Sequence, residues 1–195
     1  FCSYYGDYMQ IGINNHEGNA AFDALSHELG HGAQSLIQGY FNYEGATGAM
    51  AESLADILGN IMEMMLFEQL SDDEKDSMGM VDTENWAIEE AHKIWGIDLT
   101  IRDMADPNKY GQPAYIGDTY YIINNPYNDE GDLGGVHTNS GILNNIAYLM
   151  CKQAGVPLKD MLSIWYDSMM LLNNSSDYGS VGQYVMLSMK RKGLD

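Results

Sequence analysis

The sequence predicts a mainly helical fold with a short β element near the N-terminus. Apolar residues recur at helical spacing in several long segments, whereas strand-like alternation is confined to residues 4–13. No repeat, low-complexity tract or internal linker divides the chain. With 195 residues it is long enough to bury a hydrophobic core as a single unit.

The first two helices follow from their apolar patterns. One is predicted from about residue 22 to Gly39, where glycine favours a helix end, and its apolar stripe consists of Phe22, Leu25, Leu29, Ala33 and Leu36. The second is predicted over residues 47–70, with an inner face of Met50, Leu54, Leu58, Ile61, Met65 and Leu66. An uneven acidic insert follows at residues 71–85, and we expect a surface excursion there.

The remaining elements alternate with long loops. A shorter helical pattern covers residues 86–95. The segment 107–135 is rich in Gly, Pro, Asn and Asp, which predicts loops with little regular structure. Three further helices are predicted at residues 139–153, 158–172 and 181–192.

Composition excludes some classes of protein. The formal net charge is −19 with only nine Lys and Arg residues, and this argues against a nucleic-acid partner because phosphate binding needs a basic surface. No apolar run approaches the length of a membrane span. Cys2 and Cys151 permit one disulfide without implying it. The chain opens without an initiator Met, so we expect a mature fragment or a trimmed chain.

The first predicted helix contains the pentapeptide HELGH, which begins at His27. His27 and His31 lie four residues apart, so both imidazoles reach the same side of the helix. Such a pair suits a zinc ion, and Glu28, about a quarter-turn around, can then meet a water at the metal. The alternative is that both histidines are hydrogen-bonded boundary residues and Glu28 is a solvated charge.

A third zinc ligand is expected on the second helix. The longer zinc pattern with a third histidine is excluded, because Gln34 and Ile37 occupy its Gly and His positions. Glu52 is the candidate ligand, and Asp56, one turn later, can accept the spare ring N–H of a zinc-bound histidine. The alternative, two exposed carboxylates, fits poorly with the apolar neighbours on this helix.

A third candidate group lies in the segment GDLGGVHTNSG, residues 131–141. His137 comes just before a predicted helix and five residues after Asp132, a carboxylate that can orient the imidazole and keep it charged. Beside a zinc site, such a donor suits a developing oxyanion. The alternative is an ordinary loop or capping histidine.

Together these segments resemble the thermolysin-like neutral metalloproteases, which belong to the gluzincins. Four motifs carry the resemblance, in the family's order and near its spacing: HELGH, GAMAESLAD, IRDMADPNKYGQP and GGVHTNSGILNNIAYL. The resemblance covers residues 1 to about 172 and implies the helical C-terminal half of an α+β catalytic domain. Residues 1–20 then form the end of the β-rich half and residues 21–195 the helical zinc-binding half. We expect the rest of that N-terminal half, or a propeptide, to be a missing partner.

The resemblance implies roles for individual residues. Those at the reaction centre are the zinc ligands His27, His31 and Glu52, Asp56 behind His27, Glu28 as general base and then acid, Tyr43 and His137 as oxyanion donors, and Asp132 as the carboxylate that orients His137. Those at the substrate are Arg102, which binds the carbonyl beyond the scissile bond, and Ile88, Ile101 and Ala24, which line the pocket for the residue after the cut. The alternatives are a loop tyrosine at Tyr43, a surface salt bridge at Arg102 and ordinary core packing at the pocket residues.

The resemblance also implies calcium. Asp23, Glu63 and Glu90 fall at acidic ligand positions of the family's calcium site, whereas Asn85 and Ala87 replace two others. We therefore expect one calcium ion rather than two. The alternative is a solvated acidic face.

The implied function is a secreted, zinc-dependent endopeptidase that acts on a peptide or protein substrate. A related aminopeptidase would need an acidic motif upstream of His27 that binds the substrate N-terminus, and none is visible. The alternative from another class is a non-catalytic zinc-stabilised binding module, or an inactive fragment that lacks its N-terminal half.

Overall fold

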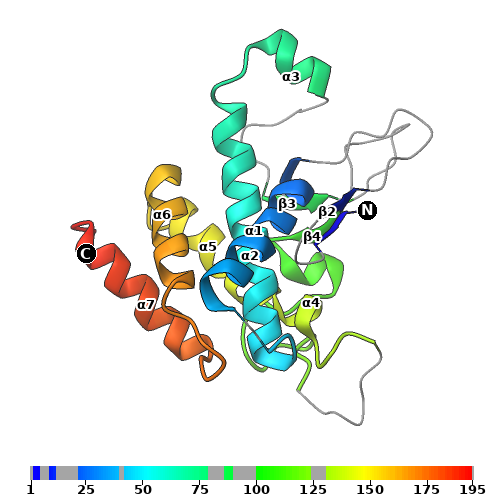
Figure 1. Cartoon of the computed structure of the whole chain (residues 1–195), viewed down its shortest axis with the longest axis vertical. Helices are drawn as coiled ribbons and strands as arrows, with labels where there is room; N and C mark the ends of the chain where they lie inside the picture. The colour runs from blue at the N-terminus through cyan, green and yellow to red at the C-terminus, as the bar shows by residue number, and fades with distance from the viewer. Residues whose placement is uncertain are drawn as a thin grey trace.

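A computed structural model of the chain describes residues 2–4, 9–11, 22–39, 42–78, 86–89, 100–123 and 131–194. The mainly helical fold that the sequence predicts is confirmed (Figure 1). The helices are α1 (Phe22–Gln38), α2 (Gly45–Phe67), α3 (Asp72–Met78), α4 (Val136–Asn139), α5 (Gly141–Lys152), α6 (Leu158–Met169), α7 (Tyr178–Arg191) and the short 3-10 helix η1 (Pro107–Tyr110). The strands are β1 (Cys2–Tyr4), β2 (Met9–Ile11), β3 (Ala87–Glu89) and β4 (Thr100–Asp103).

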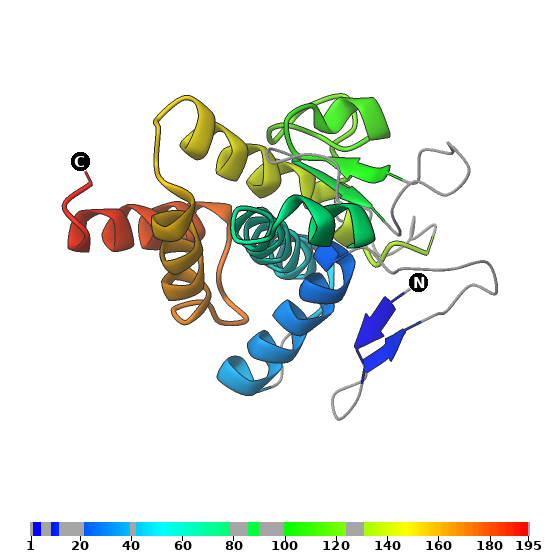
Figure 2. The same cartoon turned by 90° about the horizontal axis from the view of Figure 1, so that it is seen from above.

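Helix α2 runs through the middle of the molecule and is seen almost end-on in Figure 2. It is buried on nearly every side rather than on one inner face, because α1, α4, α5, α6 and β3 all pack against it. Ala49 and Ala55 lie off the predicted inner face and are nevertheless as fully buried as Leu54. A helix enclosed in this way is apolar all round. The polar residues that α2 does carry are therefore enclosed as well.

Helices α1 and α2 approach closely at two glycines. A Cβ atom built on Gly30 would lie 3.0 Å from the Cα of Ala55. A Cβ built on Gly59 would lie 2.8 Å from the carbonyl oxygen of Asp23 and 2.9 Å from the amide nitrogen of His27. Only glycine leaves room for such a backbone approach. It brings the backbone of α1 at His27 directly against α2.

The buried face of α1 is polar, and its apolar stripe is not buried. His27 and Gln34 face inward, and Gln34 Nε2 donates a hydrogen bond to the carbonyl oxygen of Ala51 at 2.8 Å. Leu29 and Leu36, in contrast, are 56% and 88% exposed. The polar residues can lie inside because they have hydrogen-bonding partners on α2. The helix itself and its end at Gly39, where φ is +65°, agree with the prediction.

The helix predicted over residues 86–95 is wrong for residues 87–89. These residues form β3, which pairs antiparallel with β4 and sets Ile88 opposite Arg102, while residues 90–95 lie outside the described residues. A three-residue strand has too short a pattern to be recognised on its own, and its partner strand defines it. The pairing holds Arg102 beside α2, where β3 also packs.

The C-terminal helices confirm the predicted positions with shifted ends. Helix α7 begins at Tyr178, before the predicted residue 181, because Asp177 caps it. The Asp177 carboxylate accepts a hydrogen bond from the amide of Ser180 at 2.8 Å, and the two residues form a capping box. Helices α5, α6 and α7 supply much of the core, whose largest fully buried side chains include Trp165, Met161, Ile164, Met169 and Leu143.

The shorter elements also follow the predicted organisation. Strands β1 and β2 pair antiparallel near the predicted strand-like opening, and α3 lies within the acidic excursion, away from the other helices (Figure 1). The predicted loop segment contains only the short helix η1 in its described part. None of the helices in the described ranges combines the length and apolar character that a membrane span requires.

Candidate metal centre

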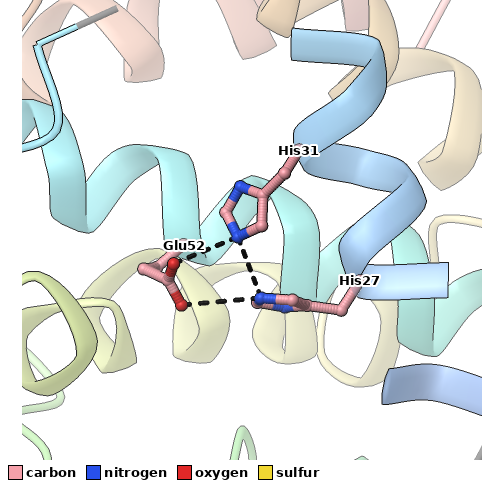
Figure 3. Close-up of side chains that lie close together, drawn as sticks. All are labelled: His27, His31 and Glu52. Atoms are coloured by element: carbon pink, nitrogen blue, oxygen red, sulfur yellow. Dashed lines mark hydrogen bonds and ion pairs between the residues drawn. The ribbon is translucent and has the colours of Figure 1, made fainter. Parts of the chain in front are cut away.

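Two histidines of α1 and one glutamate of α2 converge on a single point (Figure 3). The Nε2 atoms of His27 and His31 lie 3.0 Å apart. Glu52 faces both imidazoles, with Oε1 3.1 Å from His31 Nε2 and Oε2 3.6 Å from His27 Nε2. Within the described part of the chain, no other group of three His, Cys, Asp or Glu residues brings its ligand atoms together in this way.

The three separations fit a zinc ion. Zinc binds histidine nitrogen and carboxylate oxygen at about 2.0–2.1 Å in a tetrahedron, so two of its ligand atoms lie about 3.3 Å apart. The observed separations of 3.0, 3.1 and 3.6 Å scatter around that value. Two imidazoles and one carboxylate also leave a fourth position open, as catalytic zinc sites do. The donor set therefore suits zinc in both chemistry and spacing.

The electrostatics of Glu52 favour an ionised carboxylate. Burial alone would raise the pKa of Glu52, but its hydrogen bond with His31 and the charges of His27 and Arg102 hold the pKa well below its usual value. For His31, burial alone would lower the pKa. The hydrogen bond and the charge of Glu52 outweigh the effect of burial, so the pKa of His31 is raised. The Glu52 carboxylate thus supplies the negative charge that a cation site needs.

Asp56 lies directly behind His27. Its Oδ1 atom accepts a hydrogen bond from His27 Nδ1 at 2.7 Å and from Arg102 Nη1 at 2.6 Å, and its Oδ2 accepts from Asn144 Nδ2 at 2.8 Å. Burial would raise the pKa of Asp56, but the charges of Arg102 and His27 lower it. An acceptor on Nδ1 directs the lone pair of Nε2 toward Glu52 and His31, as a zinc-binding histidine requires.

Arg102 is buried beside both carboxylates rather than in a surface salt bridge. It is 9% exposed, and its Nη2 lies 3.3 Å from Glu52 Oε2 while Nη1 contacts Asp56. Burial would lower its pKa, but Asp56 and Glu52 raise it, so the guanidinium keeps its charge. Arg102 thus joins β4 to α2 at the site, and its expected contact with substrate stays a prediction.

Tyr43 and His137 also contact the Glu52 carboxylate. The Tyr43 hydroxyl donates a hydrogen bond to Glu52 Oε1 and lies 3.4 Å from His137 Nε2, which is itself 3.6 Å from Glu52 Oε2. The ring of Tyr43 stands between those of His31 and His137, with centroid distances of 6.2 and 6.4 Å. Burial and the charge of Glu52 raise the pKa of Tyr43, so its hydroxyl keeps its proton.

A tight loop fixes His137 through Asp132. The Asp132 carboxylate lies 2.7 Å from His137 Nδ1 and accepts hydrogen bonds from the backbone amides of His137 and Thr138 at 3.0 and 3.1 Å. Burial would raise the pKa of Asp132, but these hydrogen bonds lower it. Since Nδ1 faces the carboxylate, the second ring nitrogen of His137 points toward Tyr43 and Glu52.

Glu28 and the three predicted pocket residues lie on α1, β3 and β4. Glu28 is half-buried on α1, and its charge contributes to the raised pKa of His31, so it lies near the centre. Ile88 is buried in the hydrophobic core, whereas Ile101 is exposed and Ala24 is half-buried. Their roles at the substrate and in proton transfer stay predictions.

The expected calcium ligands are only partly described. Asp23 and Glu63 are buried on α1 and α2, and Glu90 lies outside the described residues. The calcium site therefore stays a prediction.

Three polar residues that support the site were missed by sequence reasoning. Asn144 of α5 contacts Asp56, as above, and Gln112 donates from Nε2 to the carbonyl oxygen of His137 at 2.6 Å. The Ser140 hydroxyl also donates to that oxygen, at 2.7 Å. No spacing in the sequence links these residues to their partners. Their motifs, GGVHTNSGILNNIAYL and IRDMADPNKYGQP, were the only signal.

The chain is similar to known metalloproteases. Residues 39–192 match the family described as thermolysin metallopeptidase, alpha-helical domain. A zinc metalloproteinase of Renibacterium salmoninarum is 30% identical over 86% of this chain and 30% of its own length. A bacillolysin of Bacillus amyloliquefaciens and a thermolysin of Bacillus caldolyticus are each 34% identical over 71% of this chain, covering 22% and 21% of their own lengths.

The chain thus spans less than a third of these relatives. The family match covers most of the chain, and its helical character agrees with the architecture around α2. This chain belongs to the thermolysin metallopeptidase family, as a representative of its alpha-helical domain.

Proposed function

We propose that this chain forms the zinc-binding half of a metalloendopeptidase that hydrolyses peptide bonds in peptide or protein substrates. The observation that carries the proposal is the convergence of His27, His31 and Glu52, whose ligand atoms all lie within 4.8 Å of one another. Around it stand a protonated tyrosine hydroxyl and an oriented histidine, Tyr43 and His137. These are the groups that acyl transfer at a metal requires.

His27, His31 and Glu52 hold the zinc ion in this proposal. When bound, zinc supplies Lewis acidity, which polarises a substrate carbonyl and acidifies water. Asp56 keeps His27 in the tautomer whose Nε2 faces the site, and the charge of Arg102 offsets the two buried carboxylates.

Glu28 moves the proton. It follows His27 on the same turn of α1 and accepts a proton from the water that attacks the peptide carbonyl. It then gives this proton to the leaving amine, so that the carboxylate is regenerated. The amide C–N bond breaks, and the water oxygen ends in the new carboxylate.

Tyr43 and His137 stabilise the negative charge that develops on the carbonyl oxygen. The Tyr43 hydroxyl and the Nε2 atom of His137 lie 3.4 Å apart beside Glu52, and removing one oxyanion donor typically costs about a hundred- to a thousandfold in rate. Asp132 holds the His137 ring and, through the amides of residues 137 and 138, its backbone.

Arg102 has donors to spare for a substrate. A guanidinium carries five N–H groups, and the contacts with Asp56 and Glu52 use two of its nitrogens. We propose that a remaining N–H meets the carbonyl beyond the scissile bond, beside a pocket to which Ile88, Ile101 and Ala24 contribute.

The active enzyme also needs a partner segment in this proposal. Leu29 and Leu36 expose an apolar stripe on α1, the helix that carries the histidines. Exposed apolar stripes of this kind mark contact surfaces. We propose that the rest of the β-rich N-terminal half packs here and completes the substrate cleft. Secretion, which the family resemblance implies, stays a prediction.

A non-catalytic zinc-stabilised module is the competing function. A structural zinc site would need four protein ligands but neither Glu28 nor an oriented His137. The hydrogen bond from His137 to Asp132 therefore favours the enzyme.

Metal analysis combined with a proteolysis assay tests the proposal. The chain and the full-length natural protein are loaded with zinc, and casein cleavage is followed before and after a chelator. We expect one zinc per chain, cleavage by the full-length protein, loss of cleavage with chelator and recovery with zinc. Zinc without cleavage by the full-length protein supports the binding module, and no zinc at all contradicts the metal site.

A further inference from the structure

We propose that Asn144 is a positioning residue of the metal centre, acting through Asp56 on the zinc ligands. The inference rests on the proposed function, because it concerns how the proposed zinc site is held. Asn144 lies on α5 and hydrogen-bonds Oδ2 of Asp56, whereas His27 hydrogen-bonds Oδ1.

Asp56 is the point at which four elements meet. Its carboxylate is 0% exposed and accepts hydrogen bonds from His27 of α1, Arg102 of β4 and Asn144 of α5. Two of these donors share Oδ1, whereas Oδ2 accepts only from Asn144 among the described residues. Asn144 therefore fixes the plane of the carboxylate, which the two donors on the other oxygen leave free to turn.

The amide of Asn144 has no competing task among the described residues. It is 0% exposed, and its Oδ1 atom has no hydrogen-bond partner there. Its Nδ2 must face Asp56, because the opposite orientation would set an amide oxygen against a carboxylate oxygen. A buried amide that leaves its own acceptor unsatisfied is placed for what it donates.

The effect of turning the Asp56 carboxylate reaches two of the three zinc ligands. Oδ1 holds His27 Nδ1 directly, and it holds Arg102, whose Nη2 in turn contacts Glu52 at 3.3 Å. Both contacts move when Oδ1 moves. Asn144 thus preorganises His27 and Glu52 together, while His31 is unaffected.

The first test compares Asn144→Leu with Asn145→Leu. Leucine has nearly the shape of asparagine but donates no hydrogen bond, so Oδ2 of Asp56 loses its partner. Asn145 is the matched control, since it neighbours Asn144 on α5 and donates its Nδ2 to the carbonyl oxygen of Met104 at 2.9 Å. The readouts are the zinc dissociation constant from chelator competition, the melting temperature, and kcat and KM of the full-length natural protein.

We expect Asn144→Leu to weaken zinc binding about tenfold, the lower end of what partners of metal ligands contribute, because it acts one bond further out. We expect kcat to fall with KM nearly unchanged. Asn145→Leu should leave the zinc dissociation constant within about twofold, whatever it does to the melting temperature. Equal zinc affinities in the parent and the Asn144→Leu variant would overturn the inference, as would equal losses in both variants.

A swapped pair gives a second test if Asn144→Leu does not fold. Asp56→Asn alone removes the charge of residue 56, and Asn144 must turn its amide over for its Oδ1 to accept from the new donor. Adding Asn144→Asp places a carboxylate acceptor opposite that donor and restores the original net charge. We expect the double variant to regain at least part of the zinc affinity, and a double variant weaker than Asp56→Asn contradicts the inference.

The two proposals fail in different ways. A parent chain that binds no zinc contradicts the proposed function itself. A parent chain that binds zinc while Asn144→Leu binds it equally contradicts the role of Asn144 alone.

Discussion

The Nδ1 atom of His27 lies 2.7 Å from Oδ1 of Asp56, twenty-nine positions further along the chain. This hydrogen bond links α1 to α2 behind the metal centre and leaves Nε2 of His27 facing His31 and Glu52. The tautomer of an imidazole is set by the partner of its other nitrogen. The metal centre is therefore prepared by groups that do not themselves face the metal.

The clearest catalytic prediction concerns Glu28→Gln. The amide cannot accept a proton, so we expect kcat of the full-length natural protein to fall by about 10²- to 10⁴-fold, the usual contribution of general acid–base catalysis. Zinc content should stay at one per chain because Glu28 is not a ligand. Glu68→Gln, at an exposed position, is the control. Near-normal turnover of Glu28→Gln would assign the base to another residue.

Tyr43→Phe tests the oxyanion donor. Loss of the hydroxyl should reduce kcat about a hundredfold or more while KM changes little, because the donor meets charge that exists only in the transition state. His137→Ala should likewise reduce kcat while KM changes little. Steady-state kinetics on a peptide substrate measure both effects, with Tyr166→Phe, an exposed tyrosine of α6, as the control. A rise in KM with kcat unchanged would instead indicate a role in substrate binding.

The loop that holds His137 should make stability depend on pH through Asp132. Its pKa is lowered in the folded chain, so its contribution to the free energy of unfolding is fully present above the unfolded value of about 3.9. That contribution is lost as the pH falls below 3.9 and through the folded pKa. We call the difference in the free energy of unfolding between the parent and Asp132→Asn the stability gap. We expect this gap to be constant above about pH 5 and to narrow below pH 4.

Urea unfolding at a series of pH values, with chelator throughout, measures this gap. Asp73→Asn, at an exposed position of α3, is the control. A gap of the same size at pH 3 and pH 6 would show that Asp132 has the same pKa in both states.

Gly59→Ala should damage the contact between α1 and α2. The new Cβ meets the backbone of Asp23 and His27 at 2.8–2.9 Å, so one helix must shift, and overpacking of this kind typically costs about 1–3 kcal/mol. Zinc affinity should fall as well, because His27 moves with α1. Gly182→Ala on α7 has open space around its Cβ and should stabilise the chain by about 0.5–1 kcal/mol. Thermal melts with and without zinc distinguish the two outcomes.

The predicted calcium ion should raise the melting temperature. Asp23 and Glu63 are buried carboxylates on the two helices of the metal centre, and a cation that binds only the folded chain stabilises it by mass action. We expect millimolar Ca²⁺, with zinc held constant, to raise the melting temperature, and Asp23→Asn to reduce the response. Asp76→Asn, at an exposed position, should respond like the parent. Identical melts in Ca²⁺ and in a calcium-selective chelator would contradict the site.

The spacing of residues along one helix determined which side chains of the site share a face of that helix. His27 and His31 share a face because they are four residues apart, and the same spacing relates Glu52 to Asp56. The family motifs indicated which helices carry the site residues and in which order these helices follow one another in the chain. The sequence therefore predicted that His27, His31 and Glu52 converge, together with the helical class and most helix positions.

Tertiary packing decided which faces turn inward and which distant residues meet. Leu29 and Leu36 of α1 point outward because the polar residues His27 and Gln34 find partners on α2, and β3 is a strand because β4 lies beside it. Asn144 and Asp56 are 88 positions apart, and their contact exists only because α5 packs against α2. Such contacts have no period in the sequence, since they arise from the relative placement of whole elements rather than from the geometry of one.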